Sequence, residues 1–520
     1  MTPDATALVL AGARLPGVDW AVDVSIVDGM IVALEPATSA PFADRLSAAG
    51  ASRTALEGRY LVPGLWDNHV HFSQWASASR RLDVSGADSA AGTAALVREA
   101  LATAEPEELL VGIGFRDGLW PDRPSAALLD AVTGPHPVVL ISGDLHCCWL
   151  NSAALARFRR AGHPDGVLRE EDAFAVHRAL DEVPPETVDG WALDAAKAAA
   201  ARGVVGIVDL EMAWNRESWL RRITAGHDLL RVEFGVYPQH LERAIAEGLA
   251  TGDAVGAVGS VEGSRADAGV ARGVDATGRA LVHVGPFKVI TDGSLNTRTA
   301  FCFDEYPGLE GRADSRGLLT VPPAELGALL ERATAAGFAP AVHAIGDHAN
   351  RLVLETFEQL GSGGSLEHAQ LVSDADFGRF AAAGVVAGVQ PEHAMDDRDV
   401  ADLFWAGRTG RAFALASLLE AGATLAMGSD APVAPLDPWI TMAAGTGRDR
   451  DGRAPWHPEQ RIPMAEALAA STRGRRGLHV GEVADLVSVE RDPFAATSEE
   501  LRTMPVALTL LAGRATHSAL

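Results

Sequence analysis

Short hydrophobic runs interrupted by polar residues open and close the chain. They occupy residues 7–10, 21–27, 31–34, 484–490 and 506–511. This texture is typical of antiparallel strands, and Asp28-Gly29 predicts a tight turn between two of them. We therefore predict that residues 1–62 and 478–520 together form one small β-sandwich domain.

The pattern changes between about residue 200 and residue 430, where apolar strand-like runs alternate with helical segments. The strand candidates are residues 203–209, 231–237, 282–290, 338–343, 365–368, 385–390 and 424–428. Residues 323–332 and 347–355 have the spacing of amphipathic helices between such strands. A further extended segment that ends at His71 makes eight strands. Eight βα units predict an α/β fold, a (β/α)₈ TIM barrel over residues 63–477, with its active site at the carboxyl ends of the strands.

The interval between the first and second barrel strands is unusually long. Residues 73–200 contain helical stretches at 89–104 and 189–202 and a strand-like run at 137–141. A stretch of this length should have structure of its own. We predict an insertion on the active-site side that covers the mouth of the barrel.

Composition narrows the function classes. The chain has 520 residues, a formal net charge of −25 and three cysteines. The acidity disfavours binding to nucleic acid or to anionic membranes, and the few cysteines do not form a disulfide framework. We see neither a basic, apolar leader nor a long apolar run. A cytoplasmic protein with a small-molecule partner is the expectation.

Candidate chemistry begins with His69 and His71. Residues two apart on a strand point to the same side, so both imidazoles face one space, as a divalent metal site requires. By itself the pair could be a coincidence on one strand face.

Four other predicted strands end in polar residues of the kinds found in metal sites. These are Lys288, His343, His368 and Asp430. Each has an ordinary alternative: a salt-bridged lysine, hydrogen-bonded core histidines, or an aspartate in a turn or helix cap. Their common position at the catalytic face favours a functional cluster.

These residues lie in stretches that resemble the amidohydrolase superfamily, and within it the amidohydrolase-3 (YtcJ-like) branch. The matching stretches are Pro63-Gly-Leu-Trp-Asp-Asn-His-Val-His71, Lys288-Val-Ile-Thr-Asp-Gly-Ser-Leu-Asn-Thr-Arg-Thr299, His343-Ala-Ile-Gly-Asp347, Glu367-His-Ala-Gln370, Val389-Gln-Pro391, Gly428-Ser-Asp-Ala-Pro432, Asp144-Leu-His146, Trp149-Leu-Asn-Ser152 and Pro164-Asp-Gly-Val-Leu168.

The resemblance implies one or two divalent metal ions. Its ligands would be His69, His71, His343, His368 and Asp430, and Lys288 would be carboxylated and bridge two ions. Zinc is the expected ion, although iron, manganese or cobalt suits the same donors. If Lys288 is unmodified, we expect one metal ion.

The implied reaction is hydrolysis of a C–N bond outside peptides, in an amide, formamide or cyclic amide, with N-substituted formamides as one subclass. Asp430 would accept a proton from the attacking water and pass it to the leaving nitrogen. The alternatives are ester hydrolysis or deamination at the same metals, or a non-catalytic scaffold on the same fold.

Further candidates for substrate contact are His146, Asp292, Arg298 and Trp120. Alternatively, Asp292 and Arg298 form an ion pair that orders a loop, His146 makes a structural hydrogen bond, and Trp120 packs in a core. A homodimer is common in such folds and is the expected assembly if the chain associates.

Overall fold

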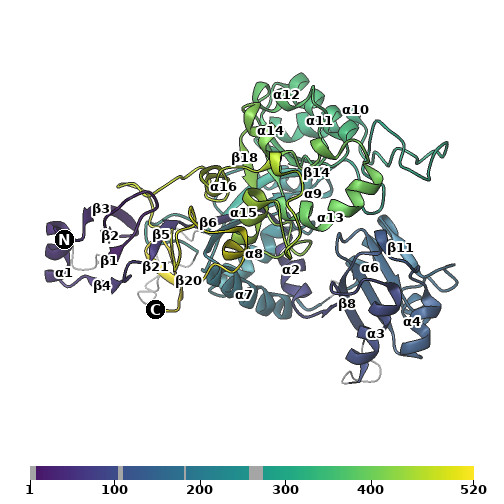
Figure 1. Cartoon of the computed structure of the whole chain (residues 1–520), viewed down its shortest axis with the longest axis horizontal. Coiled ribbons are helices and arrows are strands. Elements are labelled where there is room, and N and C mark those ends of the chain that lie inside the picture. The colour runs from purple at the N-terminus through teal and green to yellow at the C-terminus, as the bar shows by residue number, and fades with distance from the viewer. Residues whose placement is uncertain (1–6, 103–108, 181–182, 257–272) are drawn as a thin grey trace.

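The computed structural model of the chain describes residues 7–102, 109–180, 183–256 and 273–520. Its centre is an eight-stranded parallel sheet with the spatial order β18-β17-β16-β15-β14-β13-β12-β6 (Figure 1). The strands are β6 (Leu65–Val70), β12 (Val204–Asp209), β13 (Arg231–Val236), β14 (Val282–Ile290), β15 (Pro340–Ala344), β16 (Gly364–His368), β17 (Val385–Val389) and β18 (Leu425–Met427). The predicted (β/α)₈ barrel is confirmed.

Helices cover the outside of this sheet, so its strands are buried on both faces, as expected for a parallel barrel. All residues of β12 and β15 are buried. The helices are α2 (Phe72–Ala78), α7 (Pro185–Ala201), α8 (Asn215–Thr224), α9 (Pro238–Ala246), α10 (Pro323–Ala335), α11 (Asp347–Leu360), α12 (Phe377–Ala382), α13 (Pro391–Phe404), α14 (Leu415–Glu420), α15 (Pro438–Gly447) and α16 (Met464–Ala470).

Proline sets the start of several of these helices. It occupies the first helical turn of α7, α9, α10, α13 and α15, where its fixed φ suits the helix and its missing N–H costs no hydrogen bond. In α13 the consequence is local: the helix begins at Pro391, immediately after β17 has ended at Val389. Its first turn therefore lies at the carboxyl end of the barrel.

Both termini form the sandwich. One four-stranded sheet has the order β3-β2-β1-β4 and the other β21-β20-β19-β5. The elements are β1 (Ala7–Ala13), β2 (Val22–Val27), β3 (Met30–Pro36), α1 (Pro41–Ala48), β4 (Ser52–Ala55), β5 (Tyr60–Pro63), β19 (Leu486–Val489), α17 (Ser498–Arg502), β20 (Val506–Leu511) and β21 (Arg514–Ser518). One hydrophobic core joins the two sheets, with Leu10 and Ile26 from the first and Leu486 and Leu508 from the second.

The predicted turn at Asp28-Gly29 connects β2 and β3, and both residues have positive φ, of 49° and 75°. The exact division of the chain at residues 62/63 and 477/478 stays a prediction.

The insertion has a sheet of its own, of order β11-β10-β9-β8-β7. Its elements are β7 (Leu82–Asp83), α3 (Ala90–Leu101), β8 (Leu110–Phe115), α4 (Ala126–Thr133), β9 (Val138–Ser142), β10 (Cys147–Leu150), α5 (Ser152–Arg157), β11 (Val167–Arg169) and α6 (Glu171–Leu180). Helices α2 and α7, which flank it in sequence, contribute Phe72 and Ala196 to the barrel core. The part with an independent sheet is therefore narrower than the predicted residues 73–200.

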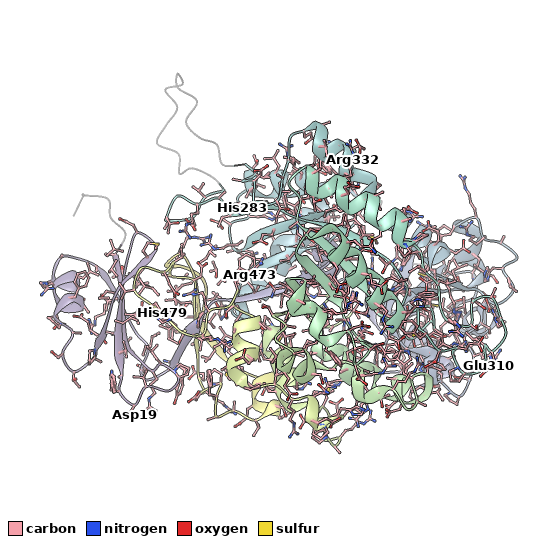
Figure 2. All side chains as sticks on the ribbon, turned by 90° about the horizontal axis from the view of Figure 1, so that it is seen from above. Asp19, His283, Glu310, Arg332, Arg473 and His479 are labelled. Atoms are coloured by element: carbon pink, nitrogen blue, oxygen red, sulfur yellow. The ribbon has the colours of Figure 1, made fainter. Side chains whose placement is uncertain are left out.

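The insertion and the terminal sandwich lie on opposite sides of the barrel (Figure 1). Asp19 of the sandwich and Glu310, in the loop after β14, mark opposite ends of the molecule (Figure 2).

The three cysteines are buried and free. Among the described helices, none has both the length and the apolar character needed to cross a lipid bilayer. The Gly-, Ala- and Asp-rich stretch 251–280 is the most loop-like part of the sequence, and its residues 257–272 lie outside the described residues.

The barrel closes where β6 meets the end of β18. The backbone N–H of His71 donates to the carbonyl of Ala431 over 2.8 Å. The side chain of Asn68 donates to the carbonyls of Met427 on β18 and Ala470 at the end of α16, over 2.8 and 3.0 Å. One amide group therefore joins three elements at the seam.

We expect Asn68→Ala to destabilise the protein by about 1–3 kcal/mol, because two carbonyl acceptors at the seam lose their donor. Urea denaturation followed by circular dichroism measures this change. An unchanged midpoint would contradict the role of Asn68 in barrel closure.

Candidate metal centre and active site

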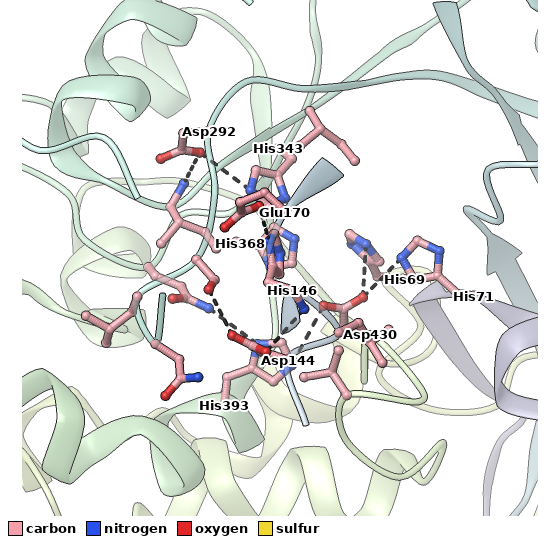
Figure 3. A pocket seen from close by; sticks show the side chains of 18 of the residues that line it. His69, His71, Asp144, His146, Glu170, Asp292, His343, His368, His393 and Asp430 are labelled. Carbon is pink, nitrogen blue, oxygen red and sulfur yellow. Dashed lines mark hydrogen bonds and ion pairs between the residues drawn. The ribbon is translucent and has the colours of Figure 1, made fainter. Parts of the chain in front are cut away.

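One pocket at the carboxyl ends of the barrel strands contains all six predicted metal ligands. The ligand candidates that line it are His69, His71, Lys288, His343, His368 and Asp430. Figure 3 shows the histidines and Asp430 around this space. The sequence prediction that these strand ends converge is therefore correct as geometry, while their metal roles stay a prediction.

The first group of donors surrounds one oxygen of Asp430. Asp430 Oδ1 lies 3.3 Å from His71 Nε2 and 3.5 Å from His69 Nε2. Lys288 Nζ lies 3.5 Å from the same nitrogen of His69. His69, His71 and Asp430 place one ligand atom each within 4.8 Å of one another, which is compatible with a single shared cation.

The second group shares the same aspartate. His368, His393 and Asp430 also bring their ligand atoms within 4.8 Å of one another. His393 Nε2 lies 3.9 Å from Asp430 Oδ2, and the rings of His343 and His368 have centroids 4.4 Å apart. Asp430 therefore stands between two clusters of imidazoles.

His393 was not among the predicted site residues. It lies in the first turn of α13, two residues after Pro391, and not on a strand. The available signal was a polar stretch, Gln390 to His393, directly after a buried strand.

Unusual backbone conformations occur at two of the candidate ligands. His368 has φ of 75° and Asp430 has φ of 59°, in the left-handed region that is uncommon for residues other than glycine. Neighbouring glycines make room for the site. A Cβ at Gly428 would lie 2.6 Å from the Cβ of His69, and one at Gly388 would lie 2.4 Å from a carboxylate oxygen of Glu367.

A buried carboxylate orients His69. Glu367 Oε2 lies 2.7 Å from His69 Nδ1, so a neutral ring donates from Nδ1 and keeps the lone pair of Nε2 for the site. Burial opposes ionisation of Glu367, but the hydrogen bond from His69 and nearby charges lower its pKa to about 2. A carboxylate behind a histidine is the usual outer support of a metal ligand.

Burial also sets the charge states. It lowers the pKa of His343 and His368 well below the usual range, so both rings are neutral at pH 7. It lowers the pKa of Lys288 to about 8. Burial would raise the pKa of Asp430, but His69, His71 and His368 hold it well below its ordinary value. Neutral imidazoles and an ionised carboxylate are the forms that bind metal.

The donor set fits a divalent metal ion. Within the described parts of the chain, His343 Nε2, His368 Nδ1 and His393 Nε2 are buried and lack a hydrogen-bond partner. Buried polar nitrogens are normally paired. Three unpaired ring nitrogens in one pocket are what a site lined with histidine ligands requires.

Residues of the insertion form the wall of the pocket that faces the barrel. Side-chain contacts hold the insertion against the barrel. Arg116 pairs with Asp396 of α13 over 2.9 Å, Asp144 accepts from Ser294 over 2.9 Å, and Glu170 accepts from Thr297 over 2.9 Å. Arg116, Asp144 and Glu170 all line the pocket.

Two of the four predicted substrate-contact residues reach this pocket. His146 and Asp292 line it. Asp292 accepts hydrogen bonds from the backbone N–H groups of Phe301, Ile345 and Gly346 over 2.9–3.0 Å. It therefore ties two loops together through backbone groups, and the structure gives it no ion pair with Arg298 among the described residues.

Arg298 and Trp120 line a neighbouring pocket instead. The guanidinium of Arg298 lies 5.2 Å from the ring centroid of Phe404. Trp120 packs edge-on against Trp149 in the core of the insertion. The loop and the insertion turn these two side chains away from the central pocket, and their contact with substrate stays a prediction.

Comparison with known proteins agrees with this geometry. A family model described as the amidohydrolase family matches residues 54–517. The putative amidohydrolase YtcJ of Bacillus subtilis (strain 168) is 26% identical over 504 residues, which cover 88% of this chain and 89% of the relative. N-substituted formamide deformylase of Arthrobacter pascens is 25% identical over 501 residues, or 88% of each chain.

A solved structure of an uncharacterized metal-dependent hydrolase from Pyrococcus horikoshii OT3 superimposes with a TM-score of 0.75 at 20% identity. The match covers 95% of this chain and 99% of that one. At this identity the likeness concerns the fold.

We expect Glu367→Gln to weaken binding of a divalent metal by about 10- to 100-fold, because the amide orients His69 less strongly. Titration of metal-free protein with zinc against a competing chelator measures the affinity. Glu459→Gln is the control, since Glu459 contacts the solvent-facing His457. Equal affinities of Glu367→Gln and the unaltered protein would contradict the supporting role of Glu367.

Proposed function

The chain belongs to the amidohydrolase family, and on this basis we propose that it is a metal-dependent hydrolase of a non-peptide C–N bond. The observation that carries the proposal is that four strand-end histidines and the buried Asp430 line one pocket, with His69 and His71 directly beside Asp430. An amide, formamide or cyclic amide is the proposed substrate class.

The relative from Arthrobacter pascens gives the substrate class its support, because its name specifies N-substituted formamides. At 25% identity this remains a proposal for the present chain. The pocket is consistent with a substrate larger than formamide itself, since its lining includes Leu145, Phe174 and Met212 beside the polar groups.

We assign the metal position with the most support to His69, His71 and Asp430, and a second position to His343 and His368, with His393 beside it. Zinc is the proposed ion, because imidazole and carboxylate donors suit it. When bound, such an ion supplies a hydroxide nucleophile near neutral pH and polarises a carbonyl group.

Asp430 is the proposed proton carrier. Its carboxylate is ionised and held by hydrogen bonding to His71, which leaves it able to accept a proton from the attacking water. As the C–N bond breaks, the same carboxylic acid returns the proton to the leaving nitrogen. The amine departs neutral, and Asp430 is again ionised.

Lys288 is the proposed bridge between the two positions. A carbamate forms from the neutral amine and carbon dioxide, and burial lowers the pKa of Lys288 to about 8, which increases the neutral fraction near pH 7. The carbamate would replace a cationic group with an anionic one beside His69, where two cations need shared negative ligands.

The cytoplasmic location and the homodimer stay predictions.

The test of function is a panel of N-substituted formamides, other amides, cyclic amides, esters and aminopyrimidines offered to the zinc-loaded protein. We expect hydrolysis of at least one formamide, other amide or cyclic amide, and a loss of about 10²- to 10⁴-fold in kcat for Asp430→Asn. His163→Ala is the control, since His163 lies in the insertion beside the exposed Asp165.

Turnover of esters or aminopyrimidines alone would favour another reaction at the same site. A fully metal-loaded protein that turns over none of the panel would favour a non-catalytic scaffold.

The carbamate has a separate test. Metal-free protein reloaded with zinc in buffer purged of carbon dioxide should bind about one ion per chain, and addition of bicarbonate should raise this to about two. Lys288→Ala should stay near one under both conditions. Mass spectrometry of metal content gives the result, and two ions in Lys288→Ala would contradict the bridging role.

A further inference from the structure

A second polar cluster faces the pocket from the insertion, apart from the candidate metal ligands. His146 and Glu170, which we call the insertion dyad, are joined by a 2.9 Å contact between His146 Nδ1 and Glu170 Oε2. Both residues line the pocket that contains Asp430. Figure 3 shows His146 in this pocket between Asp144 and the metal-ligand candidates.

The dyad is held rigidly. The other carboxylate oxygen of Glu170 accepts from the hydroxyls of Thr297 and Thr299 over 2.9 and 2.8 Å. Asp144 accepts from the backbone N–H of His146 over 3.2 Å. The ring of Phe174 packs edge-on against the imidazole, with 5.5 Å between centroids. Only Nε2 of His146 is left without a partner among the described residues.

The imidazole of His146 carries a positive charge at neutral pH. Burial lowers its pKa, but the hydrogen bond to Glu170 and the charges of Glu170, Asp144 and Asp430 outweigh burial and raise it to about 9. The other titratable groups that face it are Asp292, His343 and His177, and its charge acts on the pKa of each of them. A charged ring cannot serve as a metal ligand.

We propose that His146 is a catalytic residue whose Nε2–H donates a hydrogen bond to the substrate oxygen that becomes negative when hydroxide adds to the carbonyl. Glu170 is a positioning residue that fixes the ring and its charge. The inference rests on the proposed hydrolysis of a C–N bond and deepens it. The proton stays on Nε2 throughout, so the step adds no redox or transfer chemistry.

The physical argument is preorganisation. A donor that is fixed before the reaction stabilises a developing oxyanion without reorienting, and removal of one such donor typically costs about 10²- to 10³-fold in kcat. His146 is cationic and half-buried, and Thr297 and Thr299 brace its partner Glu170 from the barrel side. The loop after β14, through its contacts with Glu170, thus orients the imidazole of His146 in the insertion.

The first experiment uses the zinc-loaded enzyme and the best substrate of the panel. We expect His146→Gln to lower kcat by about 10²-fold with little change in KM, because the lost bond forms mainly in the transition state. His163→Gln is the matched control, a histidine of the same insertion that contacts a carboxylate, Asp165, outside the pocket.

The second experiment tests Glu170 through pH. Activity should fall as the pH rises through the pKa of His146, because the neutral ring loses its charge. Glu170→Gln removes the anion that raises this pKa, so the alkaline limb of kcat should move to lower pH. Glu170→Asp should restore much of the unaltered profile. A purely structural role would lower stability without moving the limb.

A third measurement does not depend on turnover. NMR of metal-free protein with ¹³C-labelled histidine identifies the His146 signal as the one that is missing in His146→Gln. This signal should titrate with a pKa of about 9, and Glu170→Gln should lower that pKa. A signal that titrates at or below the usual histidine pKa of about 6.5 would overturn the inference.

The outcomes separate the two proposals. An active enzyme whose His146→Gln variant keeps kcat within about threefold would overturn the role of His146 and leave the proposed function intact. A zinc-loaded protein without activity on the panel would instead remove the proposed function, and the inference that rests on it would fall for that reason.

Discussion

The buried carboxylate of Asp430 is the constraint on which the site depends. Its two oxygens lie 3.3–3.9 Å from nitrogens of His71, His69 and His393, which come from the first barrel strand and from the helix after the seventh. An ionised carboxylate in this position requires compensating partners, because burial alone would protonate it. Asp430 has a positive φ, and the absence of a side chain at Gly428 leaves room for His69 beside it.

Barrel and insertion contribute different chemistry. The barrel supplies the neutral imidazoles of His343 and His368 and the anion of Asp430, which suit a metal ion, whereas the insertion supplies the charged ring of His146. The contacts of Asp144 and Glu170 with the loop after β14 make this facing wall part of the same rigid site. Relatives with the same barrel and a different insertion would therefore keep the metal chemistry and change the groups that meet the substrate.

Much of this architecture could be predicted from the sequence because it follows simple periodicities. Side chains alternate along a strand, so His69 and His71, two residues apart, lie on the same side. Barrel active sites lie at the carboxyl ends of the strands, so residues at those ends are expected to meet: Lys288, His343, His368 and Asp430. His393 was not predicted because it lies in the first turn of a helix, and the prediction considered only residues at the ends of strands.

The insertion was harder to predict. Strands β10 and β11 have four and three residues and no clear alternation, so the sheet could not be derived from pattern. That Arg298 and Trp120 line a neighbouring pocket could not be derived either, because the path of a long loop is set by tertiary packing. Glu170 was overlooked for the same reason, since its partner His146 lies 24 residues away in the chain.

The central claim is that Asp430 and the strand-end histidines hold metal ions. A crystal structure of the zinc-loaded protein, with anomalous scattering measured on both sides of the zinc absorption edge, tests it most directly. We expect an anomalous zinc peak at about 2.0–2.2 Å from His69 Nε2, His71 Nε2 and a carboxylate oxygen of Asp430. Zinc bound elsewhere, with these three side chains free of any peak, would contradict it.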